Sequence, residues 1–276
     1  MSDRPRRSIA AMADSKHPQA ELRASPQSLD LNADMGESFG AWVMGNDAEL
    51  MPLVTSANIA CGFHAGDPGT IAATVALAME HGVAIGAHPS LPDLVGFGRR
   101  HLAVTPKEAH DLVLYQAGAV RAFVEAAGGR LHHLKAHGAL YNMAAKDRAL
   151  ARALALAVRA LGDELRLYVL AGSLMEEEAL ELGLEVRREV FADRRYLADG
   201  SLVPRSRPDA LILDEKESVQ HVLRMVQQRH LIAVDGSRVP VNAETLCIHG
   251  DKPTALPFVK ALRSILSAEG IRLAAN

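Results

Sequence analysis

Histidine, carboxylate and lysine side chains recur in this sequence at points where short apolar stretches give way to loops. His64 follows the apolar stretch Leu53–Cys61, and His88 ends the stretch that begins at Gly82. In chain order the full series is Asp34, His64, His88, Lys135 with His137, Asp193 and His249. Histidine exchanges protons near neutral pH, and carboxylates act as general bases or bind cations. The pattern therefore predicts acid–base chemistry or cation binding.

The elements that carry these residues repeat one plan of strand, loop and helix. In the clearest unit, a strand over Leu53–Cys61 leads to His64, and a helix then begins with Asp67 as its N-cap and ends at Gly82. Further strands are expected over Leu131–Leu134, Leu165–Leu170, Gly183–Phe191 and Thr245–Ile248. Two short hairpins are expected around the turns at Asp199-Gly200 and Asp235-Gly236. An α/β barrel gathers such strand ends at one rim, so we expect a single shared active site there.

Two loops and one strand end hold further candidates. Asp34 and Glu37 are neighbouring carboxylates suited to acid–base work or cation binding. Arg99 could clamp a carboxylate or phosphate, whereas Arg100 is expected to be a surface charge. Lys135 could pair with a substrate carboxylate, or with one of the two neighbouring acids.

Length and composition limit the class of protein. The chain has 276 residues, of which 49% are hydrophobic and 23% charged, as expected for a globular protein. A net charge of -3 argues against sequence-independent nucleic-acid binding, and no apolar run approaches the ~20 residues that cross a bilayer. Cys61 and Cys247 are expected to be reduced core residues, which favours a cytoplasmic protein. Residues 1–28 are expected to form a disordered tail before a single barrel domain over residues 29–276.

Several motifs, in order along the chain, resemble the LamB/YcsF family. They are Asn32-x-Asp34-x-Gly36-Glu37, the segment around His64, Gly86–Pro89 with Gly96–Arg100, His137–Asn142, Glu189–Arg194 and His249–Asp251. The resemblance covers roughly Leu29 to Ile271. It departs at Ala136, where the family usually has proline, and at Glu244, where aspartate is common.

The resemblance implies a seven-stranded β/α barrel of the glycoside hydrolase/deacetylase type. It also implies the A subunit of a prokaryotic 5-oxoprolinase, which opens the lactam 5-oxo-L-proline to L-glutamate with ATP, together with separate B and C subunits. The sequence contains no Gly-x-x-x-x-Gly-Lys-[Ser/Thr] loop and no dinucleotide fingerprint. ATP, shared with the partner subunits, would therefore need another binding architecture. A plausible chemistry is phosphorylation of the lactam oxygen followed by attack of water.

Within this interpretation the candidate residues divide into two groups. Asp34, Glu37, His64 and His88 would orient water and exchange protons, while Lys135 and His137 would steady the oxyanion or the substrate carboxylate. The candidates for substrate binding are Asn32, Asn58, Asp67, Arg99, Tyr141, Asn142, Asp193, Arg194, His249 and Asp251.

Two other functions stay open from the sequence. One is a stand-alone metal-dependent amide or sugar deacetylase, with the metal on His64, His88 and Asp34. No His-x-x-x-His pair stands in the loops that carry these three residues, which argues against it. The other is a non-catalytic binding subunit that shapes the active site of another protein.

Overall fold

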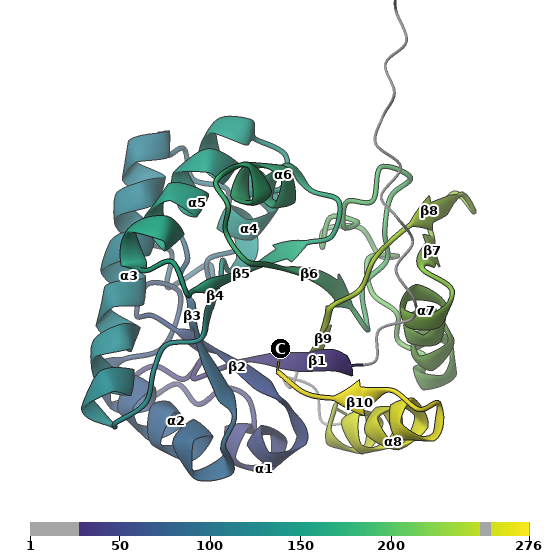
Figure 1. Ribbon diagram of the computed structural model, residues 1–276, viewed down its shortest axis with the longest axis horizontal. Coiled ribbons are helices and arrows are strands. Elements are labelled where there is room, and N and C mark those ends of the chain that lie inside the picture. The colour runs from purple at the N-terminus through teal and green to yellow at the C-terminus, as the bar shows by residue number, and fades with distance from the viewer. Residues whose placement is uncertain (1–27, 249–254, 276) are drawn as a thin grey trace, which may run out of the picture.

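Seven short segments of the described chain pair side by side, all parallel, and close into a barrel (Figure 1). The computed structural model describes residues 28–248 and 255–275. The barrel strands are β1 (Ser28–Met35), β2 (Ser56–Ala60), β3 (Ala84–His88), β4 (His133–Lys135), β5 (Arg166–Leu170), β6 (Val186–Phe191) and β9 (Thr245–Ile248). Each strand pairs with the next, and β1 also pairs with β9, which closes the sheet. β10 (Arg272–Leu273) adds to the start of β1. The expected seven-stranded β/α barrel is confirmed.

Helices surround the barrel (Figure 1). They are α1 (Asp47–Leu50), α2 (Pro68–His81), α3 (Pro106–Ala126), α4 (Gly138–Ala144), α5 (Arg148–Leu161), α6 (Leu174–Glu181), α7 (Glu215–Gln227) and α8 (Ala255–Ala268), with a 3₁₀ turn at Met51–Leu53. α2 starts and stops as its sequence predicts, because the Asp67 carboxylate accepts from the backbone N–H groups of Gly69 and Thr70, and Gly82 adopts a left-handed φ of 64°. None of the helices in the described part of the chain is both long and apolar enough to cross a membrane.

Apolar side chains pack between the strands and the surrounding helices. Residues such as Val113, Val120 and Leu154 on the inner faces of α3 and α5 are completely buried there. Burial of these faces fixes the helices against the barrel and so fixes the positions of the strand ends. Cys61 and Cys247 are both buried and reduced, as expected.

Several strand boundaries differ from those the sequence predicts, among them the start of β6, which is Val186 rather than Gly183. β2 starts at Ser56 rather than Leu53, because Met51–Leu53 forms a 3₁₀ turn with proline in its first turn. β4 is His133–Lys135 rather than Leu131–Leu134, because its pairing with β3 starts only at His133. Ser28, expected to lie in the tail, pairs with Arg272 and opens β1. Residues 1–27 lie outside the described part of the chain.

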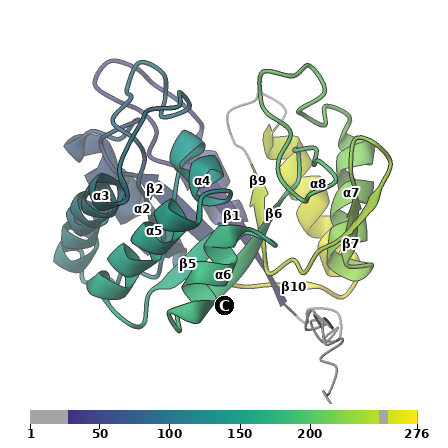
Figure 2. The same ribbon diagram turned by 90° about the horizontal axis from the view of Figure 1, so that it is seen from above.

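Both predicted hairpins form. Tyr196 and Leu202 make an antiparallel bridge around Asp199-Gly200. β7 (His230–Ile232) and β8 (Arg238–Pro240) pair around Asp235-Gly236. Seen from the side, the barrel carries long loops at one end (Figure 2).

Candidate active site

A cavity of about 570 Å³ opens among the loops that follow β3, β4 and β6. Of the residues singled out in the sequence, those that line it are Asp34, His88, Arg99, Lys135, His137, Tyr141, Asn142 and Arg194. Glu37 and His64 lie beside it, in contact with His137. The structure therefore brings all six expected catalytic residues into one neighbourhood at the carboxyl ends of the strands.

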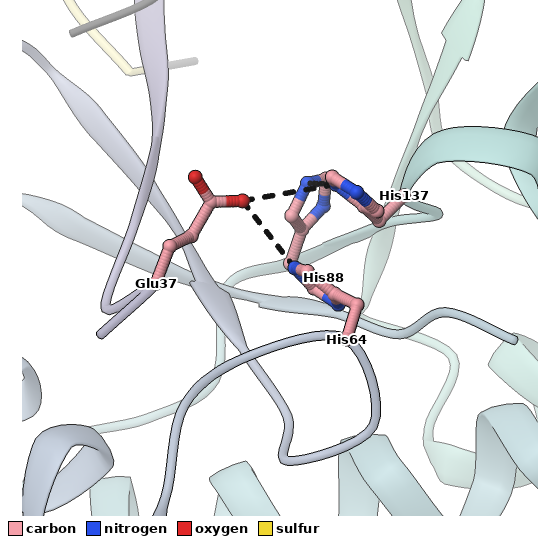
Figure 3. A group of neighbouring side chains, drawn as sticks. All are labelled: Glu37, His64, His88 and His137. Carbon is pink, nitrogen blue, oxygen red and sulfur yellow. Dashed lines mark hydrogen bonds and ion pairs between the residues drawn. The ribbon is translucent and has the colours of Figure 1, made fainter. Parts of the chain in front are cut away.

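Glu37, His64, His88 and His137 form a compact group that we call the histidine cluster (Figure 3). One nitrogen or oxygen of each side chain lies within 4.8 Å of those of the others. The Glu37 Oε1 atom is 3.3 Å from Nε2 of His64 and 3.8 Å from Nδ1 of His137. Nδ1 of His137 is 3.0 Å from Nε2 of His88. The four residues follow or end β1, β2, β3 and β4, so four successive strands supply the cluster.

Backbone carbonyl groups fix the orientation of two of the rings. Nδ1 of His88 lies 2.7 Å from the carbonyl oxygen of Lys135, and Nε2 of His137 lies 2.9 Å from that of Phe97. Since a carbonyl oxygen only accepts, both of these nitrogens must carry hydrogen and donate it. In the neutral rings, the remaining nitrogens, Nε2 of His88 and Nδ1 of His137, are bare and face each other.

The loop that follows β3 supplies both a carbonyl and close packing. Phe97 adopts a left-handed φ of 54°, which is unusual for a residue with a side chain. Its ring meets His64 and His137 edge-on, with centroids 5.3 and 5.2 Å away. The next residue, Gly98, also has positive φ, and a Cβ there would lie 2.9 Å from each of the two histidines. The predicted bent, glycine-rich loop therefore packs directly against the cluster.

Burial sets the protonation of the cluster. It lowers the pKa of His64, against the opposing effect of the Glu37 carboxylate. It also lowers the pKa of His137 well below its ordinary value, and the neighbouring His64 and His88 add to that shift. Within the described residues, Nδ1 of His64 is buried and makes no hydrogen bond. Without a cation beside them, His64 and His137 are thus neutral at physiological pH.

Lys135 is the cationic centre of the site and is almost completely buried. Its Nζ lies 3.0 Å from Oδ1 of Asp34, 2.7 Å from Oε1 of Glu189 and 3.2 Å from Oδ1 of Asn32. Burial disfavours its charge, but Asp34, Cys247 and Glu189 outweigh this effect and hold the pKa of Lys135 well above its usual range. Of the two acids expected as partners, Asp34 is confirmed; Glu189, the second partner, was not among the candidates.

A ladder of hydrogen bonds inside the barrel positions Asp34. The Asp30 carboxylate accepts from Thr245, whose hydroxyl oxygen accepts from Asn32. Asn58 then donates to Oδ1 of Asn32 and to Oδ1 of Asp34, at 2.8 and 2.9 Å. Asn32 and Asn58, both expected to bind substrate, are completely buried; the Asn58 amide donates to the Asp34 carboxylate and the Asn32 amide to Thr245.

His133 completes this ladder as a structural residue, as its place in a strand suggests. Its Nε2 lies 2.7 Å from Oδ1 of Asn58, and its ring stacks on Tyr168 with centroids 4.0 Å apart. Gly86 on β3 makes room for the ring, because a Cβ at that position would lie 2.1 Å from Nε2 of His133.

The remaining substrate-binding candidates occupy varied positions. Arg99 lines the cavity and places its guanidinium 4.8 Å from the centre of the Phe97 ring. Arg194 is buried and donates to the carbonyl of Val203, and burial lowers its pKa to about 10. The Asp67 carboxylate caps α2 and accepts from the backbone of Gly40, and these hydrogen bonds lower its pKa to about 2.

The hydroxyl of Tyr141 donates to Glu189, and the Asn142 amide donates to the carbonyl of Gly138. Asp193, which follows β6, does not line the cavity; its backbone carbonyl accepts from Ile212. Arg100 is mostly exposed, as expected, and pairs with the buried Asp93. His249 and Asp251 lie outside the described residues.

A β/α barrel with buried histidines and carboxylates at the carboxyl ends of its strands belongs to a class of folds that place their chemistry at that end. Comparison with known proteins narrows this class. The chain belongs to the LamB/YcsF family, whose model matches residues 29–276.

Relatives and a solved structure agree with this assignment. The A subunit of a 5-oxoprolinase from Bordetella pertussis is 58% identical over 247 residues, which cover 90% of this chain and 98% of that protein. A protein of the same description from Thermus thermophilus is 54% identical, with coverages of 90% and 99%. The crystal structure of a lactam utilization protein, also from Thermus thermophilus, superimposes with a TM-score of 0.84 at 52% identity, and covers 90% of this chain and all of that one.

Proposed function

We propose that this chain is the A subunit of an ATP-dependent 5-oxoprolinase, which opens the lactam ring of 5-oxo-L-proline to give L-glutamate. The observation that carries the proposal is the convergence of Asp34, the histidine cluster and Lys135 at one cavity in a chain of this family. The name of the relatives supports a complex of several subunits, and we assign this chain partners of the B and C types. The buried, reduced cysteines are consistent with a cytoplasmic setting.

The chemistry requires an activated amide, because the lactam nitrogen donates electron density into its carbonyl. In the proposed sequence, the lactam oxygen attacks the terminal phosphorus of ATP, and ADP leaves. Water then adds to the ring carbon, and the C–N bond breaks as the nitrogen takes up a proton, which leaves an acyl phosphate. A second water attacks the carbonyl carbon of the acyl phosphate, and phosphate departs with the former lactam oxygen to give the carboxylate of glutamate. The complex as a whole supplies the ATP-dependent step.

The residues of this chain are assigned to the hydrolytic half of the reaction. The histidine cluster orients the water, and Asp34 beside it accepts the proton. Arg99 and Arg194, at the cavity wall, provide positive charge for the carboxylate of the substrate. Nζ of Lys135, which carries three N–H donors, lies within 3.2 Å of oxygen atoms of Asp34, Glu189 and Asn32 and of the Sγ atom of Cys247. We therefore assign Lys135 a positioning role, in which it holds the Asp34 carboxylate in place, rather than direct contact with the oxyanion.

The experiment is an assay of the complex reconstituted with its B and C subunits, in which glutamate and ADP are measured together. We expect His64→Ala and His88→Ala to abolish ATP-dependent glutamate formation, while the circular dichroism spectrum stays that of the native protein. His110→Ala, which removes a half-buried histidine on α3 remote in sequence from the strand ends, serves as the control and should retain activity. Near-normal turnover by both cluster variants would contradict the assignment and favour a non-catalytic binding subunit.

A further inference from the structure

The histidine cluster brings electron-rich nitrogen and oxygen atoms close to one another. Nε2 of His88 and Nδ1 of His137 lie 3.0 Å apart, and the hydrogen bonds to carbonyl groups leave both of them as bare lone pairs. Oδ2 of Asp34 approaches Nε2 of His88 to 3.3 Å, and Oε1 of Glu37 approaches Nδ1 of His137 to 3.8 Å. Four electron-rich atoms therefore face one small region, which is the kind of place that a cation occupies.

A proton or a metal ion could be that cation. A single proton is shared between at most two of these atoms and leaves the others facing one another. A metal ion instead uses several lone pairs at once. The two hydrogen bonds to backbone carbonyls are of the kind that orients histidine ligands in metal sites and fixes their tautomers.

We propose that Glu37, His64, His88 and His137 bind one divalent transition-metal ion of the zinc type. The ligand atoms are Oε1 of Glu37, Nε2 of His64, Nε2 of His88 and Nδ1 of His137. Imidazole nitrogens with one carboxylate suit zinc, iron or nickel better than magnesium or calcium. The set differs from the one expected from sequence, which joined Asp34 to His64 and His88. Asp34 lies beside the site as a base, held by Lys135 and Asn58.

The separations in the cluster fit such an ion. With metal–ligand bonds of about 2.1 Å, adjacent ligand atoms lie about 3.0 to 3.4 Å apart and opposite ones about 4.2 Å. The contacts of 3.0 and 3.3 Å match adjacent ligands, and that of 3.8 Å lies between the two cases. No pair of these atoms is more than 4.8 Å apart, so the widest pair would close by up to about 1.4 Å in a tetrahedral site and about 0.6 Å across an octahedral one.

This inference concerns the site of the proposed function and deepens it, because a bound ion would lower the pKa of a water and supply the nucleophile for the ring carbon. Binding itself is measured without the reaction. The untagged protein is stripped with a chelator, and Co²⁺ is then titrated while its visible absorption is followed, with Zn²⁺ as competitor. We expect one equivalent per chain and a rise of the melting temperature on saturation.

Glu37→Gln and His137→Gln should each weaken Co²⁺ binding by more than about 100-fold, since loss of even an outer partner of a ligand costs 10–100-fold. Glu37 is only partly buried, so its variant tests the site without loss of a core side chain. His110→Gln, on the surface of α3, is the matched control and should bind as the parent does.

Binding that is weak, not stoichiometric or unchanged in both cluster variants would overturn the metal site and leave a proton as the shared cation. Two further outcomes distinguish failure of the metal site from failure of the proposed function. Stoichiometric binding without glutamate formation by the reconstituted complex would contradict the proposed function alone. Undiminished turnover by protein that binds no metal would contradict this inference alone.

Discussion

At the scale of single residues, the site depends on a buried charge that is matched by its neighbours. Lys135 is almost completely buried, and Asp34 and Glu189 supply the two negative charges that face it. Glu189 is in turn held by the Tyr141 hydroxyl at 2.7 Å. Because an unpaired buried charge is costly, each member of this group helps to hold the others in place.

Glu189→Gln should therefore destabilise the protein by about 3 kcal/mol, the cost of removing one partner from a buried ion pair. Glu185→Gln, one residue before the same strand, removes an exposed carboxylate that pairs with Arg166 and Arg187 and should cost less than about 1 kcal/mol. Urea unfolding of both variants measures the difference. Equal losses of unfolding free energy in the two variants would show that Glu189 is not needed to stabilise the charge of Lys135.

Sequence could predict some of these residues and not others. The histidines were identified because each follows an apolar strand, and a barrel gathers such positions at one rim. Glu189 lies inside a strand, next to Arg187 and Arg188. A charged side chain in a strand that alternates between two environments is normally taken as solvent-facing, and only the closed barrel shows that this one points inward.

At the scale of elements, β3 and β4 pack closely because a glycine on one strand faces a large side chain on the other. Gly86 of β3 is paired in register with His133 of β4, and the His133 ring occupies the space where a side chain of Gly86 would lie. The ring cannot withdraw, since it stacks on Tyr168 and is hydrogen-bonded to Asn58.

The same substitution at two glycines should have opposite effects. Gly86→Ala should cost about 3 kcal/mol, because its methyl group overlaps the fixed ring. Gly118→Ala lies within α3 and meets no atom within 4 Å, so the higher helix propensity of alanine should stabilise the protein by about 0.5–1 kcal/mol. Thermal and urea unfolding give both values. An unchanged or raised stability of Gly86→Ala would show that the close fit of β3 and β4 is not what requires the glycine.

The order of elements was predictable from local signals. Apolar runs between glycines and prolines gave the strands, and the Asp-Gly pairs gave both hairpins. The ligand set of the histidine cluster was not predictable in this way. The search for a His-x-x-x-His pair assumes that two ligands share one helix, whereas these four residues come from four successive strand ends.

At the scale of the whole molecule, the site exists only because the sheet closes. Asn32 of β1 and Thr245 of β9 are 213 residues apart and share a hydrogen bond of 2.7 Å. That bond links the interior ladder across the closing pair of strands and, through Asn58, reaches Asp34. Sequence patterns report on neighbours along the chain, so they could not show that these groups meet.

Closure also defines which part of the chain is needed. The seven barrel strands of the described residues lie between Ser28 and Ile248, and relatives that are matched over 98% of their length align with only 247 residues of this chain. Deletion of residues 2–27 should therefore leave the unfolding midpoint and the turnover of the reconstituted complex unchanged. Deletion of residues 2–33 also removes most of β1, which pairs with both β2 and β9. It should abolish the cooperative unfolding transition, because an open sheet exposes the polar ladder and its unpaired strand edges to water. Loss of the native melting transition in the shorter deletion would contradict a barrel that is self-sufficient from Ser28.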